Sequence, residues 1–247
     1  MNTIYILWLR QLKRYFRSKA RIIGSIGQPL LFLVALGFGF GPIFSEAGQG
    51  NYIDFLAPGI IAMSILFTAV FSGIEIIWDR QFGFLKETLV APVSRFEIMI
   101  GRTLGGATVA LFQGLLIFFI TIPFGFHPIL SAIPVAFLFM ILIALFFTAL
   151  GTAIASVLKD MQGFQLIMNF IIMPTFFLSG ALFPVATLPA FLKTVLRFNP
   201  LAYGIDGIRG VLEGGIYFGL SMDFFVLGSA TLLLLVIGGY LFSKIQI

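Results

Sequence analysis

The chain of 247 residues contains no cysteine and a single histidine, His127. Without cysteine there is no disulfide, no thiolate nucleophile and no cysteine-based metal site. Charged residues make up only 10% of the chain, against about 25% in an ordinary soluble domain. We interpret His127, beside Pro128 in a predicted turn, as a solvated side chain. The scarcity of polar chemistry disfavours a metalloenzyme and a water-soluble fold.

Sequence motifs of common enzyme classes are missing too. The chain contains no H-E-x-x-H zinc motif, no G-x-S-x-G nucleophile motif and no G-x-x-x-x-G-K-[ST] phosphate loop. The expectation is therefore a protein that is not an enzyme, with no catalytic, cofactor-binding or metal residues. Any ATP that it uses must be hydrolysed elsewhere.

Hydrophobic residues make up 60% of the chain and recur in runs of about 20, the length that crosses a bilayer as a helix. We predict an all-α integral membrane protein, a single domain over residues 1–247 with a six-helix membrane part over residues 22–247. The six transmembrane helices are predicted at residues 22–44, 55–78, 98–124, 133–158, 164–183 and 224–242.

The distribution of basic residues predicts the orientation. If the N-terminus is cytoplasmic, 12 of the 15 Lys and Arg residues fall in inner segments and only 3 in outer ones. Cytoplasmic loops are the ones enriched in Lys and Arg. The net charge of +5 therefore indicates topology and not nucleic-acid binding. Both termini are expected on the cytoplasmic side of the plasma (inner) membrane.

Residues 1–21 predict an amphipathic helix at the cytosolic interface. Its basic arc can face lipid headgroups or a cytosolic partner, or serve only as a positive-inside anchor. One arc carries Ile4, Trp8, Leu12, Tyr15 and Phe16, and the opposite arc carries Arg10, Lys13, Arg14, Arg17 and Arg21.

The segment 184–223, between the last two predicted spans, predicts two short helices. Thr187 is expected to cap the first, and Asn199-Pro200 to end it before the second begins. Helices of about eleven residues are too short to cross a bilayer. We interpret the pair as re-entrant-like helices in the outer leaflet, with an exposed surface loop as the alternative.

Glu75 is the only acidic residue within the predicted spans. It is either an interfacial carboxylate near Arg80 or part of a substrate path. Ion-driven transporters need ionisable groups in mid-membrane, so a proton or sodium motor is not expected.

The inner loop at residues 78–102 predicts a short helix that ends at Val90 before Ala91-Pro92. Ser94 and Glu97 have the spacing of a capping box that starts the next span. This loop is either a contact for a soluble motor or a plain connector. Small residues four apart, Gly101/Gly105 and Gly151/Ala155, predict close helix contacts within or between permeases.

Two stretches, ETLVAPVSRFEIMIGR at residues 87–102 and LSGALFPVATLPAFLKTVLRFNPLAYGIDGIRG at residues 178–210, resemble the ABC-2 (type 2 ATP-binding-cassette) transporter permeases of drug-resistance, nodulation and polysaccharide exporters. The resemblance implies an ATP-driven exporter that works by alternating access, with ATP and Mg bound by a separate ATPase present in two copies. It also implies a second permease, as a homodimer or heterodimer.

The resemblance assigns expected roles residue by residue. The interface helix would contact the ATPase through Arg10, Lys13, Arg14 and Arg17. The ATPase-coupling candidates are Arg80, Gln81, Phe82, Phe84, Leu85, Lys86, Glu87, Pro92 and Arg95. The outer-gate candidates are Phe183, Pro184, Leu188, Pro189, Asn199, Pro200, Tyr203, Asp206 and Arg209.

The substrate expected from the resemblance is an amphiphilic drug, as in multidrug efflux, a lipid or a glycan-type molecule. No partner role for nucleic acid is expected. The alternative function is a membrane scaffold or assembly factor that uses the same fold without transport.

Overall fold

The computed structural model describes residues 3–46, 50–90, 92–158 and 160–245, apart from the side chains of Lys86 and Leu89. Ala91 and Lys159, used in the predictions above, lie outside the described residues. The described part is helical and contains no strand. Its helices are α1 (Thr3–Arg17), α2 (Lys19–Glu46), α3 (Tyr52–Phe71), α4 (Ile74–Gln81), α5 (Phe84–Val90), α6 (Arg95–Thr121), α7 (Ile133–Val157), α8 (Met161–Ile167), α9 (Met173–Phe177), α10 (Ala190–Arg197), α11 (Pro200–Glu213) and α12 (Leu220–Ser243).

Five helical stretches in the described residues are long and apolar enough to cross a membrane. They coincide with five of the six predicted spans, and they are Lys19–Glu46, Tyr52–Gln81, Arg95–Phe124, Leu130–Val157 and Leu220–Ser243. The span predicted at 164–183 is wrong at its end, because the helical stretch there is Met161–Phe177. The count of six membrane-crossing helices therefore stays a prediction.

The shorter stretch is irregular for local reasons. Asp160 caps α8 by accepting a hydrogen bond from the Gly163 N–H at 2.7 Å. A π-helical turn, Met168–Ile172, then separates α8 from α9. Such turns insert one extra residue into a helix. After α9 the chain turns through Gly180, whose φ of 74° is left-handed and suits glycine. The span predicted at 164–183 is one continuous helix, which includes neither the π-helical turn nor the turn at Gly180.

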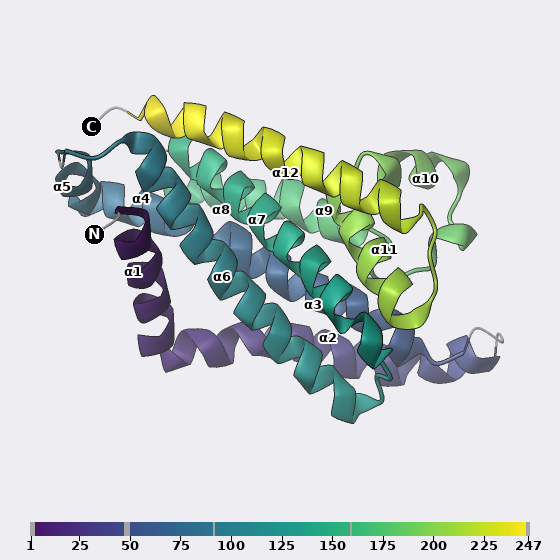
Figure 1. Cartoon of the computed structure of the whole chain (residues 1–247). Coiled ribbons are helices and arrows are strands. Elements are labelled where there is room, and N and C mark those ends of the chain that lie inside the picture. The colour runs from purple at the N-terminus through teal and green to yellow at the C-terminus, as the bar shows by residue number, and fades with distance from the viewer. Residues whose placement is uncertain (1–2, 47–49, 91, 159, 246–247) are drawn as a thin grey trace.

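The helices form a bundle around α3, the most buried of the long helices (Figure 1). α3 contacts α2, α6, α7 and α11. Figure 1 shows α5, the beginning of α1 and the end of α12 at one end of the bundle, called here the α5 end. α10 and α11 lie at the other end, the α10 end. α2 and α12 are the least buried of the long helices and leave many apolar side chains exposed.

The predicted helix boundaries hold where the signal is local. The Ser94–Glu97 capping box is confirmed at the start of α6. Asn199 caps α11, and Pro200 stands in its first turn. The predicted cap at Thr187 is wrong, because Thr187 lies in a 3-10 turn and donates its hydroxyl to the Pro184 carbonyl oxygen. α10 begins only after Pro189, since the residue before a proline is disfavoured in helix.

The predicted N-terminal helix is confirmed but is shorter than residues 1–21. α1 ends at Arg17 and α2 begins at Lys19, so Arg21 belongs to α2. Tyr15 is almost fully buried, whereas Phe16, predicted on the same apolar arc, is half exposed. α1 packs along α6.

The small residues make their close contacts within this chain. A Cβ at Gly101 would lie 3.0 Å from the Ile4 carbonyl oxygen, and one at Gly105 would lie 2.7 Å from Gln11, so both glycines admit α1. A Cβ at Gly151 would lie 2.6 Å from the Val70 carbonyl oxygen. The contact between α3 and α7 therefore requires glycine at position 151.

We expect Gly151→Ala to destabilise the protein by about 1–3 kcal/mol. The new methyl group would overlap backbone atoms, which cannot change rotamer to make room as a side chain can. The loss is measured by thermal unfolding of the purified protein in detergent. Gly228→Ala in α12 is the control, since no atom lies within 4 Å of a Cβ there. Equal melting temperatures for the two variants would contradict this account of the α3–α7 contact.

Candidate functional site

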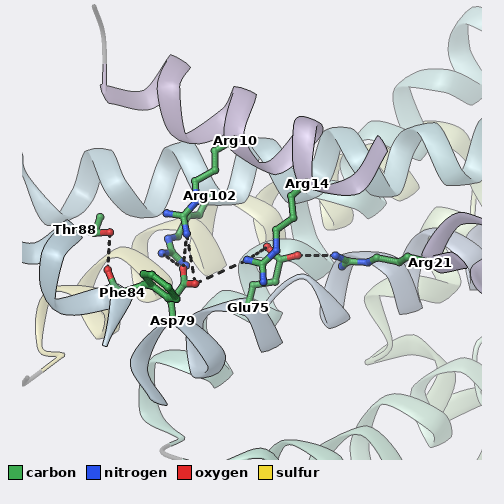
Figure 2. A network of polar contacts seen from close by, with 8 residues as sticks. All are labelled: Arg10, Arg14, Arg21, Glu75, Asp79, Phe84, Thr88 and Arg102. Carbon is green, nitrogen blue, oxygen red and sulfur yellow. Dashed lines mark hydrogen bonds and ion pairs between the residues drawn. The ribbon is translucent and has the colours of Figure 1, made fainter. Parts of the chain in front are cut away.

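Six charged side chains meet at the α5 end of the bundle (Figure 2). Glu75 and Asp79 are four residues apart on α4, so their carboxylates share one helix face. Arg10 and Arg14 have the same spacing on α1. We call the set the charge cluster, and its members are Arg10, Arg14, Arg21, Glu75, Asp79 and Arg102.

The two carboxylates have different partners. The Arg102 guanidinium lies 2.5 Å from Asp79, and Arg10 lies 3.4 Å from the same carboxylate. Arg21 donates to Glu75 at 2.6 Å. Arg14 lies between them, 3.6 Å from Glu75 and 3.9 Å from Asp79. Four helices, α1, α2, α4 and α6, are thus joined by ion pairs.

Burial makes the charge balance of this cluster important. Glu75, Asp79 and Arg102 are each less than 5% exposed, whereas the side chains of Arg10, Arg14 and Arg21 remain between 32% and 44% exposed. The described cluster has four guanidinium groups and two carboxylates, which leaves two positive charges in excess. Uncompensated charge is costly to keep away from water.

α1 is also fixed to α6 by neutral hydrogen bonds. The Tyr15 hydroxyl donates to Gln113 Oε1 at 2.6 Å, and Trp8 Nε1 donates to Thr108 Oγ1 at 3.0 Å. Burial raises the pKa of the Tyr15 phenol, which keeps it protonated as a donor. The basic arc of α1 is therefore divided: Arg10 and Arg14 pair with α4, and Lys13 and Arg17 remain exposed.

Two of the expected coupling residues bind backbone carbonyls at the ends of other helices. Arg80 donates to the carbonyl oxygens of Leu158 at 2.7 Å and Ser156 at 3.1 Å, at the end of α7. Arg80 does not pair with Glu75, whose partners are arginines of α1 and α2, and the interfacial position of Glu75 stays a prediction. Arg95 donates to the Ser243 carbonyl at 2.9 Å and to that of Ile245, at the end of α12.

The other coupling candidates differ in exposure. Phe82 is 72% exposed and Phe84 is 53% exposed. Gln81, Glu87 and Pro92 are exposed as well. Leu85, another coupling candidate, is only 2% exposed and belongs to the core. The side chain of Lys86 lies outside the described residues.

A groove of about 740 Å³ runs between α1 and the α4–α5 loop. We call it the α5 groove. Ile6, Leu9, Phe82 and Phe84 form its apolar part. Arg10, Lys13, Arg14, Arg17, Trp78 and Asp79 complete its lining. Apolar anchors with a charged rim are typical of protein interfaces.

A second hollow, of about 610 Å³, lies between α1, α2, α3 and α4. We call it the α2 cavity. Arg14, Arg21 and Glu75 of the charge cluster line it together with Tyr15, Ser25 and Gln28. Met63, Phe67, Phe71, Ile74 and Trp78 give it an apolar wall. Glu75, the candidate for a substrate path, thus borders this cavity, although its side chain is only 4% exposed.

The outer-gate candidates fall into two groups at the α10 end. Arg209 donates to the carbonyl oxygens of Gly180 at 3.2 Å and Phe55 at 3.1 Å, and its guanidinium lies 3.9 Å from the centre of the Phe55 ring. Burial lowers the pKa of Arg209 to about 10, so it stays charged at neutral pH. Burial also raises the pKa of Glu213 to about 8, so Glu213 is mostly protonated there.

The remaining polar candidates also bind backbone groups. Asn199 donates to the Thr175 and Leu178 carbonyls at 2.6 and 3.0 Å. Tyr203 donates its hydroxyl to the Arg197 carbonyl at 2.8 Å. Asp206 accepts hydrogen bonds from the N–H groups of Tyr217 and Phe218. These contacts tie α11 to the segments on either side of it.

The apolar candidates are nearer the surface. Phe183 is 54% exposed and Pro189 is exposed, while Pro184, Leu188 and Pro200 are partly buried. Pro200 begins α11, and Pro184 lines a hollow of about 530 Å³ together with Asp206 and Arg209, so the structure brings part of the apolar group beside the polar one.

Asp79 and Arg102 are the main site residues that sequence reasoning missed. The sequence predictions gave Asp79 no role, and Arg102 entered them only in the count of basic residues of the inner segments. The usable signal was the i, i+4 spacing of the Glu75/Asp79 pair at the end of a span and the same spacing of Arg10 and Arg14. Arg102 had no such signal, because its contact depends on how α6 packs.

Comparison with known proteins gives one consistent result. The family model described as ABC-2 type transporter matches residues 2–212. Nodulation protein J of Rhizobium leguminosarum bv. trifolii is 31% identical over 85% of this chain and 78% of its own length. The ycf38 transport permease of Cyanophora paradoxa is 28% identical over 99% and 89%. The inner membrane transport permease YadH of Escherichia coli (strain K12) is 26% identical over 82% and 80%.

The charge cluster predicts unequal effects of two substitutions. Asp79→Asn removes the close counterion of buried Arg102, and we expect a loss of about 3–5 kcal/mol in unfolding free energy. Arg10→Ala removes a half-exposed partner, and we expect a loss of at most about 1 kcal/mol. Thermal unfolding in detergent measures both.

The double variant Asp79→Asn, Arg102→Met removes both buried charges and should recover much of the stability lost in Asp79→Asn. A double variant less stable than the single one would contradict the assignment of Asp79 as the counterion of Arg102.

Proposed function

The chain belongs to the ABC-2 type transporter family, and on this premise we propose that it is the membrane-spanning subunit of an ATP-driven exporter whose ATPase is a separate polypeptide. Its relatives are described as transport permeases, and members of the family normally work with an ATPase subunit. The chain is accordingly a multi-pass membrane protein. Export, two ATPase copies and a second permease, identical or different, belong to the proposal.

The observation that carries the proposal is the α5 groove. Phe82 and Phe84 stand exposed beside a basic rim, and both lie outside the five stretches that are long and apolar enough to cross a membrane. Exposed aromatic side chains at a rim of charge favour a soluble protein partner. Because members of the family normally work with an ATPase subunit, we propose that the partner is the ATPase. Gln81 and Glu87 in the same loop would add polar contacts. Lys13 and Arg17 of α1 would complete the docking surface.

We place the α5 end in the cytoplasm of the cell, at the inner membrane. The excess of Lys and Arg in the segments at this end supports the assignment. ATP binding and Mg would then act on the partner, and the movement of α5 would change which side of the membrane the path opens to. The outer-gate role of α10 and α11 is part of the same proposal, supported by the buried contacts of Arg209 and Asn199. The substrate would be an amphiphile, whether drug, lipid or glycan-linked.

The coupling experiment compares two double variants. We expect Phe82→Ala, Glu87→Ala to weaken co-purification with the ATPase at least about tenfold, because interface anchors typically contribute about 2 kcal/mol. ATP hydrolysis and substrate flux in reconstituted vesicles should separate from each other. The control is Phe225→Ala, Ser229→Ala in α12, which removes an equally exposed phenyl ring, 74% exposed, and a polar group far from the groove.

Retention of both ATPase binding and coupled flux in the Phe82→Ala, Glu87→Ala variant would show that the loop is only a connector. Flux that persists without an ATPase would contradict the proposed energy source.

Orientation has its own test, because the chain has no cysteine of its own. Single cysteines at Ser45, His127 and Ala190 should react with an impermeant thiol reagent in intact cells, and cysteines at Gln81 and Gln162 should not. All five positions are exposed, so burial cannot explain a failure to react. Gln81 and Gln162 should react once the membrane is permeabilised. Reaction of this pair in intact cells would reverse the orientation.

A further inference from the structure

We propose that the α2 cavity binds an anionic amphiphile, with its negatively charged headgroup on Arg14 and Arg21 and its apolar part against Phe67, Phe71 and Trp78. This inference rests on the proposed function in one respect, because it places the cavity at the level of the cytoplasmic leaflet. It names the chemistry of the ligand, which the family does not fix.

Charge is the first argument. Among the described residues that line the cavity, Glu75 is the one acidic side chain, and two guanidinium groups approach it, at 2.6 Å from Arg21 and 3.6 Å from Arg14. Asp79, which lies 3.9 Å from Arg14, is shared with Arg102 and Arg10. The cavity lining therefore carries one positive charge more than Glu75 can neutralise, and a negative headgroup would balance it.

The position of the two arginines is the second argument. Their side chains are 39% and 32% exposed although each pairs with a carboxylate that is 4% exposed. Each guanidinium has five N–H donors, so donors remain for a ligand after Glu75 is satisfied. Ser25 and Gln28 of α2 add hydrogen-bonding groups at the same wall.

The shape of the hollow is the third argument. The volume of about 610 Å³ falls within the usual range for small-molecule sites, about 300–1,000 Å³. Both arginines come from α1 and the beginning of α2, whereas Phe67, Phe71 and Trp78 come from α3 and α4. Trp78 lies where the basic and the aromatic parts of the lining meet, because its ring centre is 6.0 Å from the Arg14 guanidinium carbon. A ligand with one charged end and one apolar end matches this division, and a free ion matches only half of it.

Tryptophan fluorescence offers a direct test, because the chain has only two tryptophans and Trp78 lines the cavity. In the Trp8→Phe background, Trp78 is the only reporter. The full-length protein is reconstituted into phosphatidylcholine nanodiscs that contain increasing fractions of either dibromo-phosphatidylglycerol or dibromo-phosphatidylcholine, whose bromine atoms quench tryptophan on contact. We expect phosphatidylglycerol to quench Trp78 at a roughly 25-fold lower fraction, at about fivefold for each of the two arginines.

Three variants in this background distinguish the cavity from general surface charge. Arg14→Gln, Arg21→Gln should abolish the preference for the anionic lipid. Lys13→Gln, Arg17→Gln removes the same charge from the α5 groove and should leave the preference unchanged. Glu75→Gln frees both arginines and should strengthen the preference severalfold, a result that mere damage to the fold would not give. Equal loss in both double variants, or a weaker preference in Glu75→Gln, would overturn the proposal.

Competition separates an amphiphile from a free anion. Dihexanoyl-phosphatidylglycerol, a soluble anionic amphiphile, should relieve the quenching, and inorganic phosphate at the same concentration should not. Equal relief by phosphate would overturn the amphiphile assignment in favour of a simple anion site. If the soluble amphiphile also stimulates ATP hydrolysis by the permease–ATPase complex, the ligand acts as cargo; binding without stimulation identifies a resident lipid.

The quenching measurement needs no ATPase, so it reads the cavity alone. A failure of the coupling experiment would leave this result standing, and a failure of quenching would leave the proposed ATPase contact standing.

Discussion

The carboxylates of Glu75 and Asp79 hold together four helices that are distant in sequence. Because each carboxylate is nearly fully buried, neither is stable there without cations, and the cations come from α1, α2 and α6. The amphipathic α1 therefore cannot move along the bundle surface as a free interfacial helix would. Its position fixes both hollows at this end, since Arg14 borders the α5 groove on one side and the α2 cavity on the other.

Glycine contacts provide the second constraint, in the middle of the bundle. The contact of α3 with α7 at Gly151 and the contact of α6 with α1 at Gly101 bring helices to backbone distance. Such contacts suit a protein in lipid, where packing and not hydrophobic exclusion holds helices together. The two least buried helices, α2 and α12, then lie at the outside, available to lipid or to a second permease.

Sequence alone was sufficient for features that depend on neighbours along the chain. The Ser94–Glu97 box, the Asn199 cap and the amphipathic α1 need only a few adjacent residues. The Met161–Phe177 stretch was misjudged because hydropathy cannot register a π-turn or the left-handed turn at Gly180. The burial of Leu85 could not be predicted for a different reason: a leucine in a short polar loop gives no sign of which neighbour will cover it.

Long-range contacts of the charged residues were beyond sequence reasoning. Arg80 is close to Glu75 along α4, yet Arg80 donates to carbonyl oxygens at the end of α7 and Glu75 pairs with arginines of other helices. Arg102 was visible only as one more basic residue. Spacing within one helix is readable, but the partner across two helices depends on their packing angle, which a single sequence does not specify.

The two arginines on either side of α5, Arg80 and Arg95, fix the loop between them to the rest of the bundle. Arg80 donates to a carbonyl oxygen at the end of α7, and Arg95 donates to one at the end of α12. The two ends of the loop are therefore attached to different helices. α12 continues to the opposite end of the bundle, beside α11. The Arg95 contact therefore connects the loop to the α10 end by a route that does not include the central helix α3.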